Sequence, residues 1–241
     1  MIWMLATALA GTFDADALLE RVSATQGHRA HRLDGPKPTF DEDAYRKAAR
    51  GKVVTGLLRV DGDSNRVGYG LAVMDVGIDA LWAGINSETQ HVDLLPVDHI
   101  EVHTGEACAD SRKVLMTASV PLITDRWWIT QNTYNTAIHE ASAGAMRELG
   151  WASPTDFASL PLSTAATAAT DGLVPIGFSK GAWFLVSLDA DHTLVEYHSW
   201  VDPGGRVPSS AASMFATAGI EDTFEAMETY AQGTPYCASR M

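Results

Sequence analysis

The chain has few cysteines, few basic residues and no long apolar run. Its two cysteines, Cys108 and Cys237, lack the spacing of a metal site, and the sequence is compatible with a disulfide or with two free thiols. Only 17 Lys and Arg stand against 30 Asp and Glu, a formal net charge of −13. That deficit argues against nucleic acid as a partner and against permanent adhesion to anionic membrane, whereas transient membrane contact stays open. No run approaches the roughly 18 apolar residues of a membrane span.

Familiar catalytic motifs are also missing. The sequence has no P-loop, no G-x-S-x-G and no H-E-x-x-H. His99, Glu101 and His103 alternate on a predicted strand and could bind zinc, and Glu196 with His198 could form an acid–base pair. A solvated strand face or a satisfied polar network explains these sets better. We therefore predict no metal, no cofactor and no enzymatic activity.

The first eleven residues, MIWMLATALAG, have two interpretations. The run is apolar and ends in small residues resembling a cleavage site, but it is short for a signal peptide and lacks a basic start. A signal remnant would favour a periplasmic or secreted protein over a cytoplasmic one. The alternative is a terminal element packed on the domain.

The rest of the chain has the composition of a soluble globular protein, with 46% hydrophobic and 20% charged residues. Helical spacing predicts a helix from Asp14 to Ser23. Thr39 and Glu42 form a capping box for a second helix, which we expect to end near Arg50 before Gly51. Residues 1–50 are thus interpreted as a helical lead-in.

Strand patterns dominate the remainder. β-branched and aromatic content predicts strands at residues 53–60, 68–73, 99–103, 113–120, 126–134, 145–151, 181–188 and 193–201. Apolar spacing predicts a short helix at 78–85 with Asp75 as its N-cap, and an amphipathic helix at 209–231. The small polar run 164–170 is expected to be a loop. This order predicts an α+β fold with helices on one face of an antiparallel sheet.

Five blocks occur in an order that identifies a resemblance. They are GLAVMDVGIDALWAGI at 70–85, LLPV at 94–97, PLITDRWWI at 121–129, GAW at 181–183, and DPGG at 202–205 followed by Pro208. On these blocks the chain, from about residue 51 to 231, resembles START domains, the lipid-transfer branch of the helix-grip superfamily that also contains polyketide-cyclase-like proteins. The resemblance implies a curved antiparallel sheet wrapped on a long C-terminal helix around an apolar cavity. It implies a domain at 51–232 and a C-terminal tail at 233–241.

The sequence departs from the family at two places. Trp127 follows Arg126 where the family usually has an acid. Sterol-binding animal members carry a buried acid and arginine, and counting from Arg126 without gaps puts these positions at Lys113 and Asn132. That acid–arginine pair is therefore absent or displaced here.

The resemblance also implies a set of ligand-binding residues. Alternation along the strand at 126–134 puts Trp128, Thr130, Asn132 and Tyr134 on one face. We expect that face to point inward, because it holds the family's arginine position. The expected ligand-binding residues are Lys113, Leu115, Trp128, Thr130, Asn132, Tyr134, Tyr197, Met214, Phe215, Ala218, Phe224 and Met227.

The leading hypothesis is a monomeric, soluble lipid-transfer protein that binds a sterol, hopanoid, phospholipid or fatty acid. An alternative is a cyclase- or dehydratase-like enzyme acting on a polyketide-type substrate, with Glu196, His198 and Tyr134 as candidate catalytic residues. A third is a helix-grip protein with a filled core that binds a partner. Finding titratable groups together inside the cavity would distinguish the second hypothesis from the other two.

Overall fold

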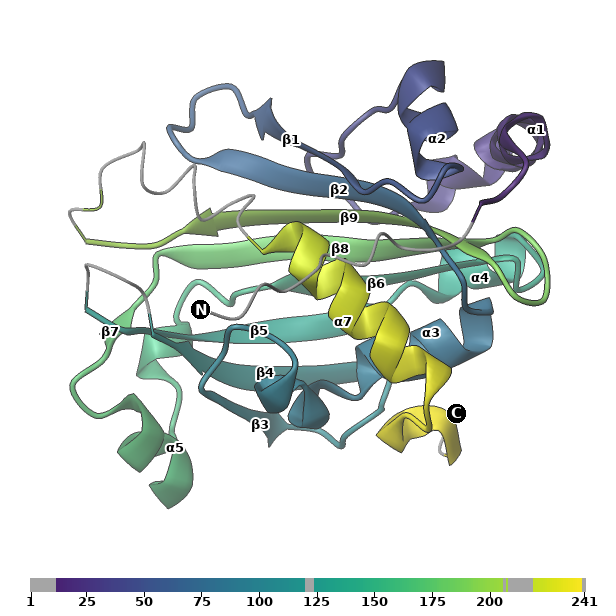
Figure 1. Ribbon diagram of the computed structural model, residues 1–241. Coiled ribbons are helices and arrows are strands. Elements are labelled where there is room, and N and C mark those ends of the chain that lie inside the picture. Colours follow the sequence, from purple (N-terminus) through teal and green to yellow (C-terminus); the bar gives the residue numbers. More distant parts are fainter. Residues whose placement is uncertain (1–11, 120–123, 206, 208–218, 240–241) are drawn as a thin grey trace, which may run out of the picture.

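One sheet of nine strands forms the frame of the molecule (Figure 1). The structure, a computed structural model, describes residues 12–119, 124–205, 207 and 219–239. The strand order is β1–β2–β9–β8–β6–β5–β4–β3, with antiparallel neighbours, and β7 pairs in parallel with β5. The strands are β1 (Val54–Arg59), β2 (Arg66–Met74), β3 (His99–Thr104), β4 (Ser111–Ala118), β5 (Arg126–Tyr134), β6 (Met146–Ala152), β7 (Val174–Pro175), β8 (Phe178–Ser187) and β9 (Thr193–Asp202).

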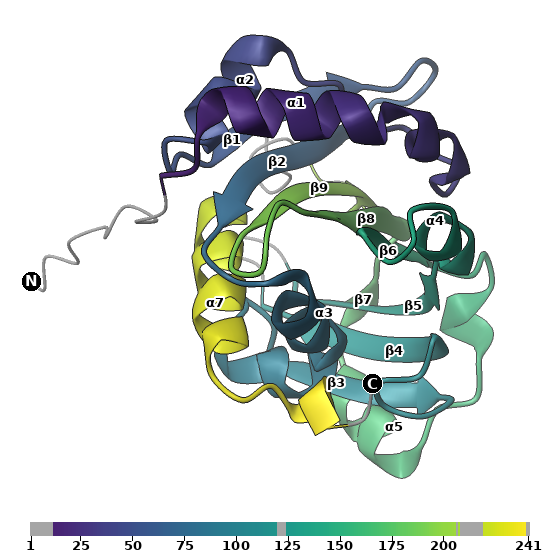
Figure 2. The ribbon, with the colours of Figure 1, turned by 90° about the vertical axis from the view of Figure 1, so that its right-hand side faces the viewer.

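The helices lie on both sides of this sheet, which is strongly curved when seen from its end (Figure 2). The C-terminal helix α7 (Ile220–Gln232) lies across the sheet, and α3 (Ile78–Asn86) packs against it. We call the sheet face toward α7 the inner face and the opposite one the outer face. The other helical elements are α1 (Ala15–Thr25), η1 (Gln26–His31), α2 (Glu42–Ala48), η2 (Glu88–Asp93), α4 (Thr136–Ala141), η3 (Phe157–Ser159), α5 (Thr164–Thr170) and η4 (Tyr236–Ser239). None of the described helices is long and apolar enough to cross a membrane.

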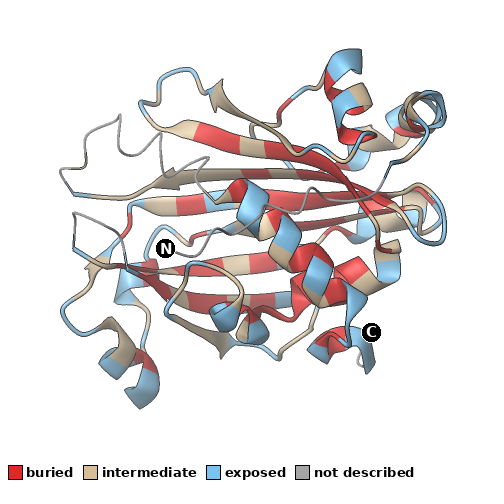
Figure 3. Cartoon of the chain, in the orientation of Figure 1, coloured by how far each residue is buried: buried red, intermediate tan, exposed pale blue. Residues whose placement is uncertain are grey.

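Helix α7 has one buried side and one exposed side (Figure 3). Ile220, Phe224, Met227 and Ala231 recur at helical spacing and are all buried. The helix lies so close to β2 that a Cβ on Gly70 would come within 2.7 Å of Ile220 Cγ2. The amphipathic pattern therefore determines which side of α7 faces the sheet, and a glycine on β2 permits the close contact.

Three apolar clusters hold the layers together. One joins α7 and α3 to the inner face, and it includes Met74, Trp82 and Trp183. A second joins α1 and α2 to the outer face of β2, β8 and β9. A third lies around Trp127, Phe157 and Ile176, beside α5. Residues 12–50 are thus packed directly on the outer face of the sheet.

The α+β helix-grip fold predicted from the sequence is confirmed. All eight predicted strands are present with shifts of a few residues, and the described part of the predicted C-terminal helix is helical. Residues 1–11 of the chain lie outside the described residues. So do residues 209–218, the first part of the predicted C-terminal helix.

Four local predictions were wrong or incomplete. Residues 164–170 form helix α5 instead of a loop, because the Ser163 hydroxyl accepts a hydrogen bond from Ala166 N (2.9 Å) and alanine is the best helix former. Asp41, not Thr39, caps α2 by accepting from Ala44 N at 2.8 Å. Gly77 replaces Asp75 as the N-cap of α3, and the short helix α4 was not predicted.

Candidate functional site

Aromatic side chains from four different elements gather on the inner face. Tyr197 of β9 lies 4.6 Å from Trp183 of β8 and 5.8 Å from Trp151 of β6, measured between ring centroids. Phe224 of α7 lies 5.6 Å from Trp183. These residues share a face because paired antiparallel neighbours point the same way: Trp183 is directly opposite Tyr197 in the β8–β9 register. The sheet and α7 thus build an aromatic cluster that only the folded chain assembles.

A second aromatic pair lies farther along the same face. Trp82 of α3 and Tyr134 of β5 have ring centroids 4.7 Å apart. Burial raises the pKa of Tyr134 to about 12. Burial likewise raises the pKa of Tyr197, although a hydrogen bond with Ser199 acts in the opposite direction.

Several of these aromatic residues keep accessible surface even though α7 covers the same face. Trp151, Tyr134 and Tyr197 are only half-buried, whereas Phe224 and Met227 opposite them are fully buried. An amphipathic ring with an apolar body and a polar tip suits a site where a ligand replaces water. The half-buried aromatic residues are therefore the best candidates for ligand contact among the described residues.

A buried polar network lies beside them on the inner face. Arg112 of β4 forms an ion pair with Glu88 of η2, with Nε–Oε2 at 3.1 Å and a second, shorter contact from Nη2 to Oε1. Asn132 Nδ2 donates to the same Glu88 carboxylate (2.9 Å), and the Thr130 hydroxyl donates to Asn132 Oδ1 (2.8 Å). Arg112 Nη2 also donates to Asn86 Oδ1 at 2.9 Å. Since all five residues are buried and hydrogen-bonded, the charges are compensated inside the fold.

Sequence reasoning missed Glu88 and Arg112. Counting from Arg126 without gaps put the family's acid–arginine positions at Lys113 and Asn132, which are not cross-strand partners in the structure. In the structure Asn132 is opposite Arg112, whereas Lys113 is opposite Gln131 and points to the outer face. A buried acid–arginine pair is present next to Asn132, but its carboxylate comes from η2, which no strand pattern could indicate.

The structure brings together part of the expected ligand set. Thr130, Asn132, Tyr134 and Tyr197 point to the inner face, and Phe224 and Met227 pack against it from α7. Trp128 is half-buried and contacts the cluster around Trp127. Leu115, like Lys113, points to the outer face, where it is buried in that same cluster. Met214, Phe215 and Ala218 lie outside the described residues.

The candidate catalytic residues do not come together. Glu196 and His198 point to the outer face, whereas Tyr134 points to the inner face. Glu196 Oε2 forms an ion pair with Arg32 Nη1 at 2.8 Å, so the Glu196 carboxylate already has a charged partner. His99 Nε2 lies 3.2 Å from Glu101 Oε2. In the described part of the chain no three His, Cys, Asp or Glu side chains are arranged to hold a metal ion.

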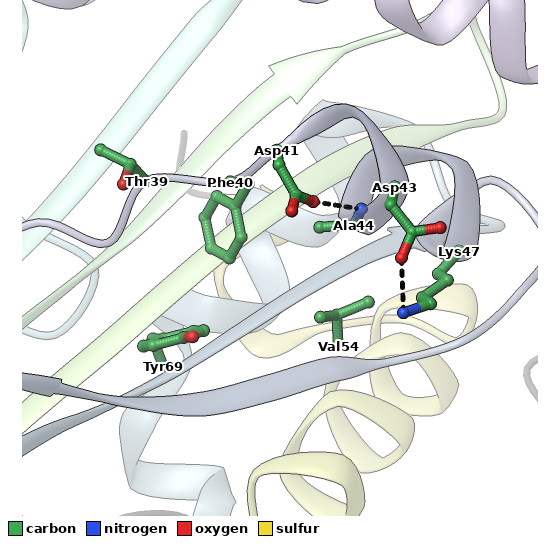
Figure 4. Close-up of a pocket in the computed structure, with 8 residues that line it drawn as sticks. All are labelled: Thr39, Phe40, Asp41, Asp43, Ala44, Lys47, Val54 and Tyr69. Atoms are coloured by element: carbon green, nitrogen blue, oxygen red, sulfur yellow. Dashed lines mark hydrogen bonds and ion pairs between the residues drawn. The ribbon is translucent and has the colours of Figure 1, made fainter.

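A separate surface pocket of about 520 Å³ lies on the outer side, between α2 and the strands β1 and β2 (Figure 4). Its carboxylates serve local structure: Asp41 caps α2, and Asp43 pairs with Lys47 at 2.6 Å. Phe40 and Tyr69 form an edge-to-face pair in its wall, with ring centroids 5.6 Å apart. No residue of the expected ligand set lines this pocket.

Comparison with known proteins identifies the fold. No protein-family model and no curated protein sequence matches the chain. Among solved structures, the chain is similar to a STAR-related lipid transfer protein from Xanthomonas axonopodis (22% identity, TM-score 0.60, covering 75% of this chain and 94% of that one). It is also similar to human STARD10 (14% identity, TM-score 0.59, covering 86% and 79%) and to human StAR-related lipid transfer protein 5 (11% identity, TM-score 0.60, covering 91% and 98%). The chain therefore has a START-like helix-grip fold.

Proposed function

We propose that this protein binds one hydrophobic lipid between the inner face of the sheet and α7, and carries it as a lipid-transfer protein. The observation that carries the proposal is the set of half-buried aromatic residues, Trp151, Tyr134 and Tyr197, on a face that the closing helix covers. The START-like fold supports it, because similar folds include proteins named as lipid-transfer proteins.

The chemistry of the inner face favours retention without a covalent step. Each ligand methylene that leaves water contributes about 0.8 kcal/mol, so a sterol or an acyl chain is held by burial alone. The Tyr197 and Ser199 hydroxyls, which alternation places on the same face of β9, offer a polar contact for a ligand hydroxyl or carbonyl. Glu196 and His198 lie on the opposite face of the sheet from Tyr134, which favours binding over an enzyme that would use these three residues together.

Native mass spectrometry of the purified protein, followed by solvent extraction, tests the proposal. We expect a stoichiometric lipid, or binding of a fluorescent sterol (dehydroergosterol) or a fluorescent fatty acid (cis-parinaric acid) when the protein comes without one. Excitation of the inner-face tryptophans should transfer energy to either probe. A protein that carries no lipid and binds neither probe nor a phospholipid would contradict the proposal.

A matched pair of tryptophan variants locates the site. Trp151→Leu removes an inner-face ring, whereas Trp200→Leu removes one from the outer face of β9. We expect Trp151→Leu to weaken probe binding by roughly 2- to 10-fold and Trp200→Leu to leave it unchanged. Equal effects of the two variants would place the ligand elsewhere.

A further inference from the structure

The C-terminal end of α7 is attached to the sheet by a disulfide. Cys237 of η4 is fully buried and bonds to Cys108, which lies 129 residues earlier in the turn between β3 and β4. The remaining described contacts of η4 include a hydrogen bond from Cys237 N to Ser87 Oγ (3.0 Å), and Ala238 and Ser239 are exposed. The disulfide is therefore the covalent restraint on the chain that follows α7, in addition to the packing of η4 on α3.

The turn that holds Cys108 has an unusual backbone. Cys108 has a φ of 68°, in the left-handed region that side chains other than glycine rarely adopt. Such a conformation persists only while the surroundings hold it in place, and here the bond to Cys237 is part of those surroundings. Breaking the bond removes one restraint that holds the turn in this conformation.

A continuous series of contacts joins this turn to the inner face. The carbonyl of Ala109, next to Cys108, accepts a hydrogen bond from Arg112 Nη1. Arg112 pairs with Glu88, and Glu88 accepts from Asn132. These three side chains are buried, so a shift of the turn changes the position of charged groups that cannot be resolvated.

In the reduced protein, the Cys237 thiol would also have a hydrogen-bond acceptor within reach. Cys237 Sγ lies 3.1 Å from the carbonyl oxygen of Asn86. A disulfide sulfur has no proton to donate, whereas the free thiol can donate its S–H to this carbonyl. Cys108 is half-buried, with exposed residues before it in the same turn, whereas Cys237 is fully buried, so Cys108 is the more accessible residue of the pair.

We propose that the Cys108–Cys237 disulfide is a redox switch that sets how firmly the protein retains its ligand. This inference rests on the proposed function. A thiolate of a dithiol reductant attacks Cys108 Sγ and expels Cys237 as a thiolate, which takes up a proton. The second thiol of the reductant then releases Cys108, so two electrons and two protons pass to the protein and the reductant becomes a disulfide. The reduced protein holds its ligand more loosely.

The test measures release of dehydroergosterol and cis-parinaric acid from the full chain to phosphatidylcholine vesicles. We expect dithiothreitol to weaken the equilibrium affinity for the probes by about 5- to 150-fold, the usual range of coupling between two sites, and to speed their release. The double variant C108S/C237S should release fast without reductant and should not respond to it. Equal release from oxidised, reduced and double-serine protein would overturn the switch and leave the proposed function intact.

Two controls separate the switch from simple loss of stability. Phe157→Ala removes a buried ring from the third cluster, on the far side of the sheet, and keeps the disulfide. Its oxidised form should release the probes at the wild-type rate, and fast release from this variant would overturn the proposal. Hydrogen–deuterium exchange needs no ligand: reduction should speed exchange at residues 106–112 and 233–239. Unchanged exchange there would overturn the switch even for a protein that binds neither probe.

Discussion

The two faces of the sheet use buried polar groups in different ways. On the inner face, aromatic residues such as Trp151 and Tyr197 keep accessible surface, and the Glu88–Arg112 pair is enclosed. On the outer face, charges join the N-terminal helices to the sheet: Arg32 lies between Glu148 (Nε–Oε1, 3.0 Å) and Glu196 (Nη1–Oε2, 2.8 Å). The inner face therefore keeps accessible aromatic surface, whereas the charges on the outer face are paired with the N-terminal segment.

The outer-face network is unusually well enclosed. Glu148 and Glu196 are 0% and 1% exposed, and Arg32 also lies 3.9 Å from the centroid of the Phe184 ring. Leu33 N and Asn135 Nδ2 both donate to Glu148 Oε2 at 2.8 Å. Since buried carboxylates are costly without such partners, residues 12–50 form part of the folded unit and the network makes their removal unfavourable.

The largest expected effect comes from removing the cation at the centre of this network. Arg32→Met leaves Glu148 and Glu196 buried without their shared partner, and we expect a loss of about 3–5 kcal/mol in the free energy of unfolding. Urea denaturation measures it. Probe binding by the folded fraction should stay at the wild-type level. A loss below about 1 kcal/mol would mean that the network contributes little.

Two consecutive residues on β9 provide the sharpest test of the comparison, because they point to opposite faces. Glu196→Gln should lower the free energy of unfolding by about 1.5–3 kcal/mol and leave ligand affinity unchanged, since it weakens charged hydrogen bonds on the outer face. Tyr197→Phe should cost about 1 kcal/mol or less and change ligand affinity. Urea denaturation measures the stability of both variants, and probe titration measures their ligand affinity. A change of affinity in Glu196→Gln with none in Tyr197→Phe would refute the assignment of the faces.

The fit of α7 on the inner face gives a third prediction. Gly70→Ala introduces a Cβ within 2.7 Å of Ile220 and 3.0 Å of Phe224. We expect a loss of about 1–3 kcal/mol from overpacking, with faster amide exchange in α7. Gly27→Ala is the control, because an added Cβ there meets nothing within 4 Å. Equal stability of the two variants would show that α7 does not rest on Gly70.

The fourth prediction concerns pH and the outer face, and its effect is small near neutral pH. Burial, Arg32 and Lys37 lower the pKa of His198 to about 3. The unfolded chain, with an imidazole pKa of about 6.5, takes up the proton first, so this stability is present above about pH 6.5 and lost as the pH falls toward 3. The slope is at most about 1.4 kcal/mol per pH unit. The contribution of His198 is the difference in pH dependence of the free energy of unfolding between wild type and His198→Gln. The same pH dependence in both proteins would contradict the prediction.

Local patterns predicted most of the elements and only part of the site. The strands and the buried side of α7 follow from alternation and from helical spacing, which short stretches of chain determine by themselves. Tyr134 and Asn132 were expected on the inner face from the resemblance, because strand alternation alone does not say which face points inward. Glu88 and Arg112 were missed because their pairing joins a 3₁₀ turn to a strand 24 residues later.

The sequence by itself determined the excess of acidic residues, the order of strands and helices, and the amphipathic stripe of α7, because each depends on residue type and near neighbours. Only the tertiary structure decided which face of each strand points inward, since a shift of one residue in pairing moves every side chain to the other face. It also decided that Cys108 and Cys237 pair, because their Cα atoms are brought to 5.7 Å by contacts between distant segments. The inward face of the strands and the cysteine pair both depend on contacts between segments far apart in the chain. A short stretch of sequence does not contain that information.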